Sequence, residues 1–295
     1  MRIAVFTRTG FHHTCFINRL QEEFEIACVV REFYPPRPGG DSSLPSLLRK
    51  IFAKRSLSKI RDENFLKGFH ELYSAGFRYS PVLREYLKSP FDVVMEKPAT
   101  KYLNVGCGEI NSNDFELFLR NIKPDIVAAL GSSIIKPNII SIPSVAMINL
   151  HSGLSPYYRG TWSYGWPVVN REPEYIGVTV HHVNPGIDTG DIIFQTKPVL
   201  EKKDDLNSVF LKVISEGIEL VVKAIGEFVK NGYVESFRQP VNTGRQYFAK
   251  DFNADTARRC LRAVEDGIIE KYTANRAEID WGVKLYGYVP PKIFK

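Results

Sequence analysis

Side chains suited to acid–base chemistry gather between residues 146 and 191 of the sequence. The apolar run 146–150 contains Asn149 and is followed directly by His151. Asp188 lies further on, in the turn-like stretch 186–191. Side chains alternate along a strand, so Asn149 and His151 would share one face near its carboxyl end, where open α/β sheets carry their active sites. An amide that does not titrate, an imidazole that moves protons near neutral pH and a carboxylate that orients the imidazole together form an acid–base centre.

The residues around this pattern resemble the formyltransferase family that uses 10-formyltetrahydrofolate. Its members carry Asn-x-His followed by Ser-Leu-Leu-Pro-x-x-Arg-Gly, then Gly-Val-Thr, then an Asp in an x-x-Asp-x-Gly loop. The positions in register here are Asn149, His151, Leu154, Pro156, Arg159, Gly160, Gly177-Val178-Thr179, Asp188 and Gly190. Two positions depart from the pattern, because Gly153 replaces the family's Ser and Ser155 replaces its second Leu. The match is close between about residues 125 and 200 and weak elsewhere.

The resemblance implies an N-formyltransferase whose catalytic residues are Asn149, His151 and Asp188. Formyl transfer to a primary amine passes through a tetrahedral carbon bearing an oxyanion, and the amine must lose a proton. Asn149 can donate to the oxygen, His151 can donate or shuttle the proton, and Asp188 can hold the imidazole. This chemistry requires no metal and no covalent nucleophile. A lone Asn-x-His is more commonly a satisfied polar pair, but the coincidence of all these spacings favours catalysis.

The resemblance also assigns binding segments. The pterin ring of 10-formyltetrahydrofolate is expected against a loop held largely by backbone groups. The expected donor-binding residues are Gly131, Ser132, Ser133, Ile134 and Ile135, with Gly186 and Ile187. Tyr158, Arg159, His12 and His13 are the candidates for acceptor binding.

Two histidine pairs have simpler explanations. For His12 and His13, one exposed and one partly packed ring is the favoured interpretation, with acceptor binding a side role. Adjacent helical positions point to different sides, which disfavours a paired metal site. His181 and His182 are expected to be structural, one facing inward and one outward.

The remaining chain predicts the elements that must position these side chains. Apolar periodicity indicates strands at 2–7, 25–30, 91–95, 103–105, 125–130, 175–183 and 192–199, and helices at 11–24 and 114–121. A longer helix begins at Asp204 or Asp205 and ends at Asn231-Gly232. This order predicts an α/β fold with a Rossmann-like, mostly parallel sheet and helices on both faces.

The chain is expected to divide into a catalytic domain at 1–232 and a short C-terminal appendage at 233–295, which includes a helix near 255–266. A helical, basic insertion is expected at about 41–90. Its residues 41–70 carry seven Lys or Arg against three Asp or Glu, a net charge of 7 − 3 = +4. A solvated helical hairpin is the favoured explanation, over contact with a phosphorylated acceptor, a nucleic acid or a membrane.

Composition limits the class of protein. With 295 residues and 44% hydrophobic residues the chain can bury a full core, and a net charge of +6 is a mild basic excess. Charged residues interrupt every long apolar run, and the first strand lacks a cleavage site for a signal peptide, so a cytoplasmic protein without a membrane span is expected. The four cysteines are widely spaced and form no Cys-x-x-Cys, which argues against disulfides and structural zinc.

The acceptor is inferred by resemblance to three branches of the family. Methionyl-tRNA formyltransferases append a β-barrel, whereas 295 − 232 = 63 residues follow Gly232, so tRNA is disfavoured. Glycinamide ribonucleotide formyltransferases use a glycine-rich first turn, which residues 8–13 lack. Amino-sugar N-formyltransferases fit better, and imply a small-molecule amine that is phosphorylated or nucleotide-linked. The aromatic residues that could stack on a base are Tyr247, Phe248 and Trp281, although core or dimer packing explains them equally well.

Three alternatives stay open beside the amino-sugar enzyme. They are a methionyl-tRNA formyltransferase-like enzyme, a 10-formyltetrahydrofolate hydrolase that uses water as the acceptor, and a non-catalytic folate-binding module. A homodimer also remains open.

Overall fold

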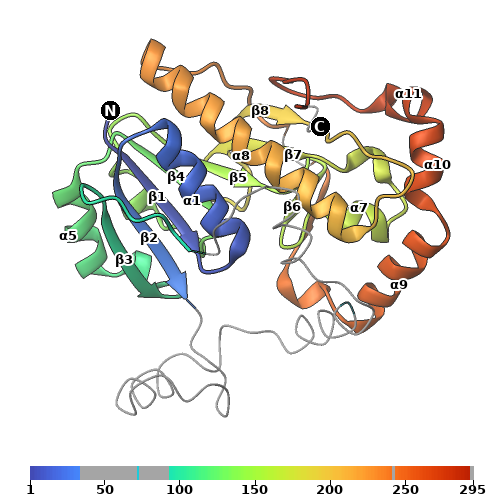
Figure 1. Cartoon of the computed structure of the whole chain (residues 1–295), viewed down its shortest axis with the longest axis horizontal. Helices are drawn as coiled ribbons and strands as arrows, with labels where there is room; N and C mark the ends of the chain where they lie inside the picture. The colour runs from blue at the N-terminus through green and yellow to red at the C-terminus, as the bar shows by residue number, and fades with distance from the viewer. Residues whose placement is uncertain (34–71, 73–92, 241–242, 293–295) are drawn as a thin grey trace.

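The computed structural model describes residues 1–33, 72, 93–240 and 243–292 (Figure 1). The helical insertion expected at 41–90 lies outside the described residues, with the exception of the buried Leu72.

A seven-stranded sheet forms the centre of the molecule, in the order β3-β2-β1-β4-β5-β7-β8 (Figure 1). The strands are β1 Ile3–Arg8, β2 Ile26–Phe33, β3 Lys101–Gly106, β4 Ile126–Leu130, β5 Ala146–His151, β7 Val178–His182 and β8 Ile192–Thr196. All neighbours from β3 to β5 are parallel, whereas β7 runs antiparallel to β5 and to β8. The predicted mostly parallel sheet is therefore confirmed.

Helices cover both faces of this sheet, as predicted. The period of two along β1 sends Ile3 and Val5 into one hydrophobic core, and Ala4 and Phe6 into the other. The first core is closed by α1 (Phe11–Glu23) and α8 (Leu206–Asn231), which lie side by side in Figure 1. The second core is closed by α5 (Asn113–Ile122). All five residues of β4 are buried, as expected for a central strand covered on both sides.

The long helix α8 begins where a reciprocal cap satisfies its first backbone donors. The Asp205 side chain accepts from the Ser208 backbone N–H at 2.8 Å, and the Ser208 hydroxyl accepts from the Asp205 N–H at 2.9 Å. Asp204, the other predicted cap, instead accepts from Lys212 Nζ at 2.6 Å. The predicted end of the helix is confirmed, because Gly232 follows it in the left-handed region with φ 79°.

One predicted strand has no counterpart in the described residues, and another begins later than predicted. Residues 93–95 form no strand, because the Asn18 side chain binds the backbone carbonyl of Val93 at 3.2 Å and the backbone N–H of Met95 at 2.9 Å. The strand expected from residue 175 begins only at Val178, because a 3₁₀ turn precedes it.

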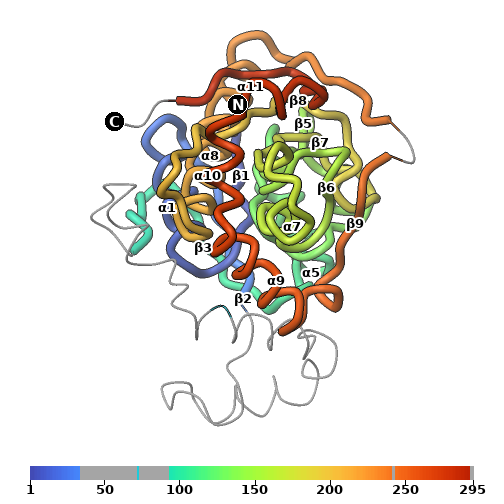
Figure 2. Tube along the Cα trace, turned by 90° about the vertical axis from the view of Figure 1, so that its right-hand side faces the viewer, coloured from blue at the N-terminus to red at the C-terminus, as the bar shows by residue number. Residues whose placement is uncertain are grey.

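The segment beyond Gly232 packs against the sheet domain. Its short strand β9 (Arg245–Tyr247) pairs in parallel with β6 (Tyr158–Gly160), and the predicted helix is confirmed as α9 (Ala254–Glu265). Figure 2 shows this segment descending through β9 and returning through α9 and α10. Phe252 and Tyr272 of this segment are buried in the same core as α8. The two parts therefore share a core, and a domain boundary at residue 232 stays a prediction.

The remaining elements are short. They are η1 Glu109–Asn111, α6 Pro137–Ile140, α7 Trp166–Val169, η2 Pro173–Tyr175, η3 Ala249–Asp251, α10 Ile268–Ala274, α11 Arg276–Ile279 and η4 Asp280–Gly282. No helix in the described part of the chain combines the length and the apolar character needed to cross a bilayer.

The cap of α8 gives a prediction about stability. Asp205→Ala removes the acceptor of the Ser208 N–H, and we expect it to lower the free energy of unfolding by about 1 kcal/mol. Urea denaturation measures this difference. Asp205→Asn keeps a capping oxygen and is the control, so equal losses in the two variants would show that the cap contributes nothing.

Candidate active site

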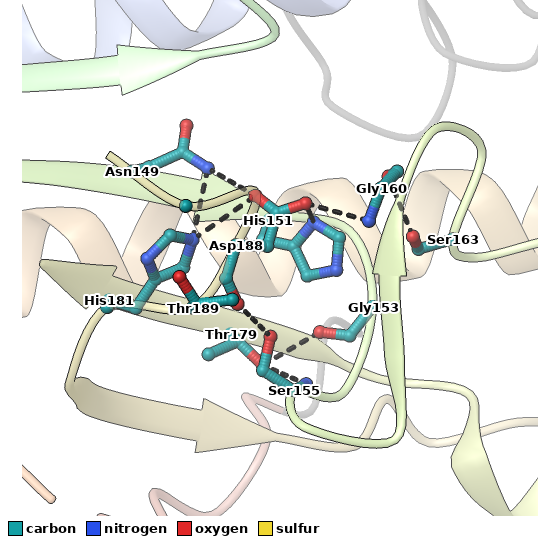
Figure 3. Close-up of polar contacts among 12 residues, drawn as sticks. Asn149, His151, Gly153, Ser155, Gly160, Ser163, Thr179, His181, Asp188 and Thr189 are labelled. Atoms are coloured by element: carbon teal, nitrogen blue, oxygen red, sulfur yellow. Dashed lines mark hydrogen bonds and ion pairs between the residues drawn. The ribbon is translucent and has the colours of Figure 1, made fainter. Parts of the chain in front are cut away.

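The three side chains that the sequence singles out meet at the carboxyl end of β5 (Figure 3). Asn149 and His151 come from β5, and Asp188 comes from the loop between β7 and β8. Asp188 Oδ2 lies 3.3 Å from His151 Nδ1, and Asp188 Oδ1 lies 3.4 Å from Asn149 Nδ2. An amide, an imidazole and a carboxylate thus form one polar cluster.

Asp188 is fixed in place from several directions. Its backbone lies in the left-handed region with φ 51°, a conformation that aspartate tolerates better than most residues. Oδ2 accepts from the Gly160 backbone N–H at 2.8 Å. The Asp188 backbone carbonyl accepts from Gln239 Nε2 at 3.0 Å and from the Ser155 hydroxyl at 3.4 Å. These contacts hold the carboxylate in one orientation.

The electrostatics of the cluster favour an ionised Asp188 and a neutral His151. Burial opposes the ionisation of Asp188, but the two neighbouring imidazoles and the Gly160 N–H outweigh it, and the pKa of the carboxyl lies below its ordinary value. Burial lowers the pKa of the His151 imidazole, and the opposing effects of Asp188 and the Tyr158 carbonyl do not restore it. At neutral pH the carboxylate therefore carries the negative charge beside an imidazole that can accept a proton.

The hydrogen bonds of His151 decide which nitrogen can take that proton. Nε2 lies 2.8 Å from the Tyr158 backbone carbonyl, which only accepts, so the neutral ring carries its hydrogen on Nε2. Nδ1 is then the basic nitrogen, and it faces Asp188. A proton taken up at Nδ1 would be stabilised by the adjacent carboxylate.

Gly153 is required by the packing around this imidazole. A Cβ at residue 153 would lie 2.5 Å from Ser163 Cβ, 2.8 Å from His151 Nε2 and 2.9 Å from the Tyr158 carbonyl oxygen. The side chain that the family pattern carries at this position has no room here. The departure from the pattern therefore follows from the tight contact between the ring and the 158–160 strand.

His181 belongs to the cluster, although the sequence predicts it to be only structural. It lies directly opposite Asn149 in the antiparallel pairing of β5 and β7, so both side chains point to the same face. His181 Nε2 is 3.2 Å from Asn149 Nδ2 and 3.4 Å from Asp188 Oδ1. Nδ1 donates to the His182 carbonyl at 2.7 Å, which leaves Nε2 as an acceptor for the Asn149 amide. His182 instead packs against Phe228.

A cavity of about 510 Å³ opens in front of the cluster. Its lining includes Asn149, His151 and Asp188, together with all the residues expected to bind the folate and both histidines expected at the acceptor. These residues are Gly131, Ser132, Ser133, Ile134, Ile135, Gly186, Ile187, His12 and His13. The structure therefore brings two separated segments and the cluster around one space. Their binding roles stay predictions.

Glu32 is a buried residue that the sequence did not single out. At the carboxyl end of β2, its Oε2 accepts from the Ser133 backbone N–H at 2.6 Å, and Oε1 accepts from the Ser133 hydroxyl at 2.6 Å. Oε1 also accepts from the Gly108 N–H at 2.7 Å. An acidic residue near the end of a mostly hydrophobic strand could have signalled such a role. Glu32 fixes the shape of the 131–135 loop.

Two predicted acceptor residues lie elsewhere. The Tyr158 side chain is 1% exposed, and its hydroxyl bonds Glu172, Asn170 at 3.0 Å and Arg245 at 2.7 Å. Arg159 Nη2 donates to the Thr243 carbonyl at 3.1 Å. Neither lines the cavity, because β6 uses both side chains to hold the segment beyond Gly232.

The interpretation of the first histidine pair is also corrected, because neither ring is exposed. His13 is buried, and its Nδ1 lies 2.7 Å from the Thr7 hydroxyl. His12 is half-buried and stacks on His13 with ring centroids 3.9 Å apart. Burial, followed by the charge of Arg8, lowers the pKa of His12 to about 4, so this ring is neutral at pH 7.

The three aromatic residues considered for stacking on a base lie in different surroundings. Tyr247 and Phe248 line the cavity, whereas Trp281 is 92% exposed and lies outside its lining. Tyr247 stacks on Trp166 with ring centroids 3.9 Å apart, and Phe248 remains 44% exposed. Phe248 is therefore the ring that is open to a ligand.

Within the described residues, no group of three or more His, Cys, Asp or Glu is placed to hold a metal ion.

The pairing of His151 with Asp188 predicts a measurable titration. We expect the His151 imidazole to titrate below the ordinary value of about 6.5. Asp188→Asn removes a charge that favours the imidazolium, so the pKa of His151 should fall further. NMR titration of the ring protons, assigned with His151→Asn, measures both. A rise in Asp188→Asn would contradict the proposed pairing.

Known proteins resemble this chain in sequence over its middle part. The family model described as formyl transferase matches residues 84–225. The methionyl-tRNA formyltransferase of Pelotomaculum thermopropionicum is 30% identical over 143 residues, covering 46% of this chain and 45% of that enzyme. The chain thus matches less than half the length of this relative.

Solved structures share the fold. A Mycobacterium tuberculosis protein suggested to be a sugar N-formyltransferase superposes with a TM-score of 0.53 at 16% identity, covering 89% of this chain and 86% of that protein. The sugar 3N-formyl transferase WlaRD, solved with dTDP and 5-N-formyl-THF, gives a TM-score of 0.52 at 18% identity, covering 89% and 78%. The matched region of the sequence contains Asn149, His151 and Asp188, and over this region the chain is similar to the formyl transferase family.

Proposed function

We propose that this protein is an N-formyltransferase that moves a formyl group from 10-formyltetrahydrofolate to a primary amine on a nucleotide-linked sugar. The observation that carries the proposal is the meeting of Asn149, His151 and Asp188 on one wall of a 510 Å³ cavity. The cavity also contains the loop 131–135, to which the folate is assigned.

The reaction joins two bond changes. The lone pair of the amine attacks the formyl carbon, and a tetrahedral intermediate with an oxyanion forms. The bond from this carbon to N10 of the folate then breaks, the formamide forms, and the proton lost by the amine is returned to N10. The protein must stabilise the oxyanion and carry this proton between the two nitrogens.

The cluster supplies both functions. His151 Nδ1 accepts the proton, and the ionised Asp188 stabilises the resulting imidazolium. The hydrogens of the Asn149 amide face His181 and Asp188 at the long distances of 3.2 and 3.4 Å. Such bonds yield to a stronger acceptor, so the amide can donate to the formyl oxygen as negative charge develops. His181 and Asp188 hold the amide in place until then.

The acceptor is assigned from the other wall of the cavity. Arg8 lines it and offers a positive charge to phosphate groups. Phe248 supplies an open ring on which a base can stack. The fold is shared along 89% of the chain with WlaRD, whose structure was solved with dTDP. These features favour a nucleotide-linked acceptor over tRNA, the substrate named for the sequence relatives.

An acceptor panel tests the assignment. Release of tetrahydrofolate from 10-formyltetrahydrofolate is followed without amine, with nucleotide-linked amino sugars and with methionyl-tRNA. We expect turnover with an amino sugar nucleotide and little without amine. Equal turnover in water would instead establish a hydrolase, turnover restricted to methionyl-tRNA would replace the acceptor, and folate binding without turnover would establish a silent module.

Truncation of the cluster should lower turnover without preventing folding. We expect Asn149→Ala and His151→Ala each to reduce kcat by about 100-fold or more, the usual effect of losing one oxyanion donor or proton carrier. His182→Gln changes a neighbouring histidine outside the cavity and is the matched control. Near wild-type transfer by His151→Ala would remove the proposed proton acceptor.

Gly153 provides a test through packing alone. The added methyl of Gly153→Ala meets His151 and the Tyr158 carbonyl at under 3.0 Å, so the imidazole must shift. We expect kcat to fall by about 100-fold, since misplacement of a reacting group by about 1 Å has this effect. Gly226→Ala is the matched control, because a Cβ there meets nothing within 4 Å. Equal kcat values in the two variants would show that catalysis does not depend on the position of the His151 ring.

A further inference from the structure

A second hollow of about 460 Å³ lies between the end of α7, strand β9 and helix α9. The described linings of the two hollows have no residue in common. Four arginines line the second one: Arg171, Arg245, Arg259 and Arg262. Among the described residues of this lining, Glu172 is the one acid, so the lining carries a net charge of 4 − 1 = +3.

Two of these arginines are held in position by carboxylates. Arg245 makes a bidentate pair with Glu172, with Nη2 to Oε1 at 2.8 Å and Nη1 to Oε2 at 2.5 Å. Arg171 pairs with Asp266, which lies outside the lining. These pairs order the two guanidinium groups at the rim of the hollow.

The other two arginines form no close ion pair among the described residues, although Arg262 lies near enough to Asp266 for the two charges to interact. Arg259 and Arg262 are three residues apart on α9, so they lie on the same face of the helix. Over the part of the chain that the structure describes, neither guanidinium has an ion-pair partner. Two guanidinium groups outside any close ion pair therefore border the same space as two paired ones.

The backbone of Arg171 gives a second indication of a ligand site. It follows α7 in the left-handed region with φ 60°, at a position where helices usually place glycine. Keeping a long cationic side chain in this conformation costs free energy that glycine would save. Arg171 nevertheless occupies this position and lines the hollow.

We propose that this hollow binds a diphosphate group, at a site separate from the reacting centre. Guanidinium groups bind phosphate oxygens through paired hydrogen bonds, and four arginines against the two acids Glu172 and Asp266 leave a net charge of 4 − 2 = +2 for a compact polyanion. Among the described residues that line the hollow, Val169 is the one apolar side chain, so it offers no surface to an acyl chain. The proposal does not depend on the reaction proposed above.

Tyr247 and Tyr158 connect the second hollow to the cavity that contains the reacting centre. Tyr247 lines the first cavity, and its hydroxyl accepts from Asn170 of the second hollow at 2.8 Å. Arg245 donates to the Tyr158 hydroxyl, and the Tyr158 backbone carbonyl holds His151. A diphosphate in the hollow would thus sit directly behind the wall that supports the catalytic imidazole.

Calorimetric titration with inorganic pyrophosphate tests the proposal at about 0.15 M salt, where weak surface attraction is screened. We expect saturable binding to one site. The double variant Arg259→Ala/Arg262→Ala should weaken it about tenfold or more, because both guanidinium groups outside any close ion pair are lost. Arg238→Ala removes an exposed arginine elsewhere and should bind like the wild type. Circular dichroism, and the Arg→Gln version of the double variant, check that α9 remains folded.

Two further arms locate and identify the ligand. Saturation with 5-formyltetrahydrofolate, which occupies the first cavity under the proposed function, should leave pyrophosphate binding unchanged. If a nucleoside diphosphate binds as tightly as pyrophosphate, the site recognises the phosphates alone. If it binds more tightly than pyrophosphate, the site also recognises the nucleoside. Either result supports a diphosphate site. The proposal is overturned by the absence of saturable binding, by full retention of affinity in the double variant, or by displacement with the folate.

Discussion

The structure depends on keeping one charged carboxylate where water is largely excluded. Asp188 retains its charge because groups from separate parts of the chain surround it: the Gly160 backbone N–H of β6 donates to it, and the rings of His181 on β7 and His151 on β5 lie beside it. Desolvating an ion costs several kcal/mol unless such partners are present. The carboxylate therefore holds the sheet, the 158–160 strand and the loop after β7 in one arrangement. In this arrangement Asn149, His151 and Asp188 form one acid–base centre.

Much of this arrangement follows from local sequence. The alternation in β5 fixes the common face of Asn149 and His151, and apolar runs at the strands fix a mostly parallel sheet covered on both sides. The glycine and aspartate residues of the 186–191 loop are typical of a turn, which predicts that Asp188 lies just before the following strand. These features depend on neighbours within a few residues, so they can be predicted from the sequence. The segment 131–135 is expected near the site by resemblance alone; it lines the cavity, and its role in folate binding stays a prediction.

The remaining features depend on contacts between distant residues, which local patterns do not encode. His181 joins the cluster only because β7 reverses direction and pairs it opposite Asn149. Tyr158 turns away from the cavity because β6 pairs with β9, and the pairing commits its side chain to Glu172. Glu32 lies 101 positions from the serine that it fixes. Such register and pairing information appears only when the sheet is assembled.

Gln239 links the loop 186–191 to the segment that follows Gly232. Its amide donates to the backbone carbonyls of Asp188 at 3.0 Å and Gly190 at 2.6 Å, so the loop that carries the carboxylate rests on a residue beyond Gly232. Exchanging this segment for one from another protein would remove that support together with the residues by which the segment lines the two cavities. A chimaera made to accept a new substrate must therefore reproduce this amide, or a substitute brace for the loop, before its altered specificity can be expressed as turnover.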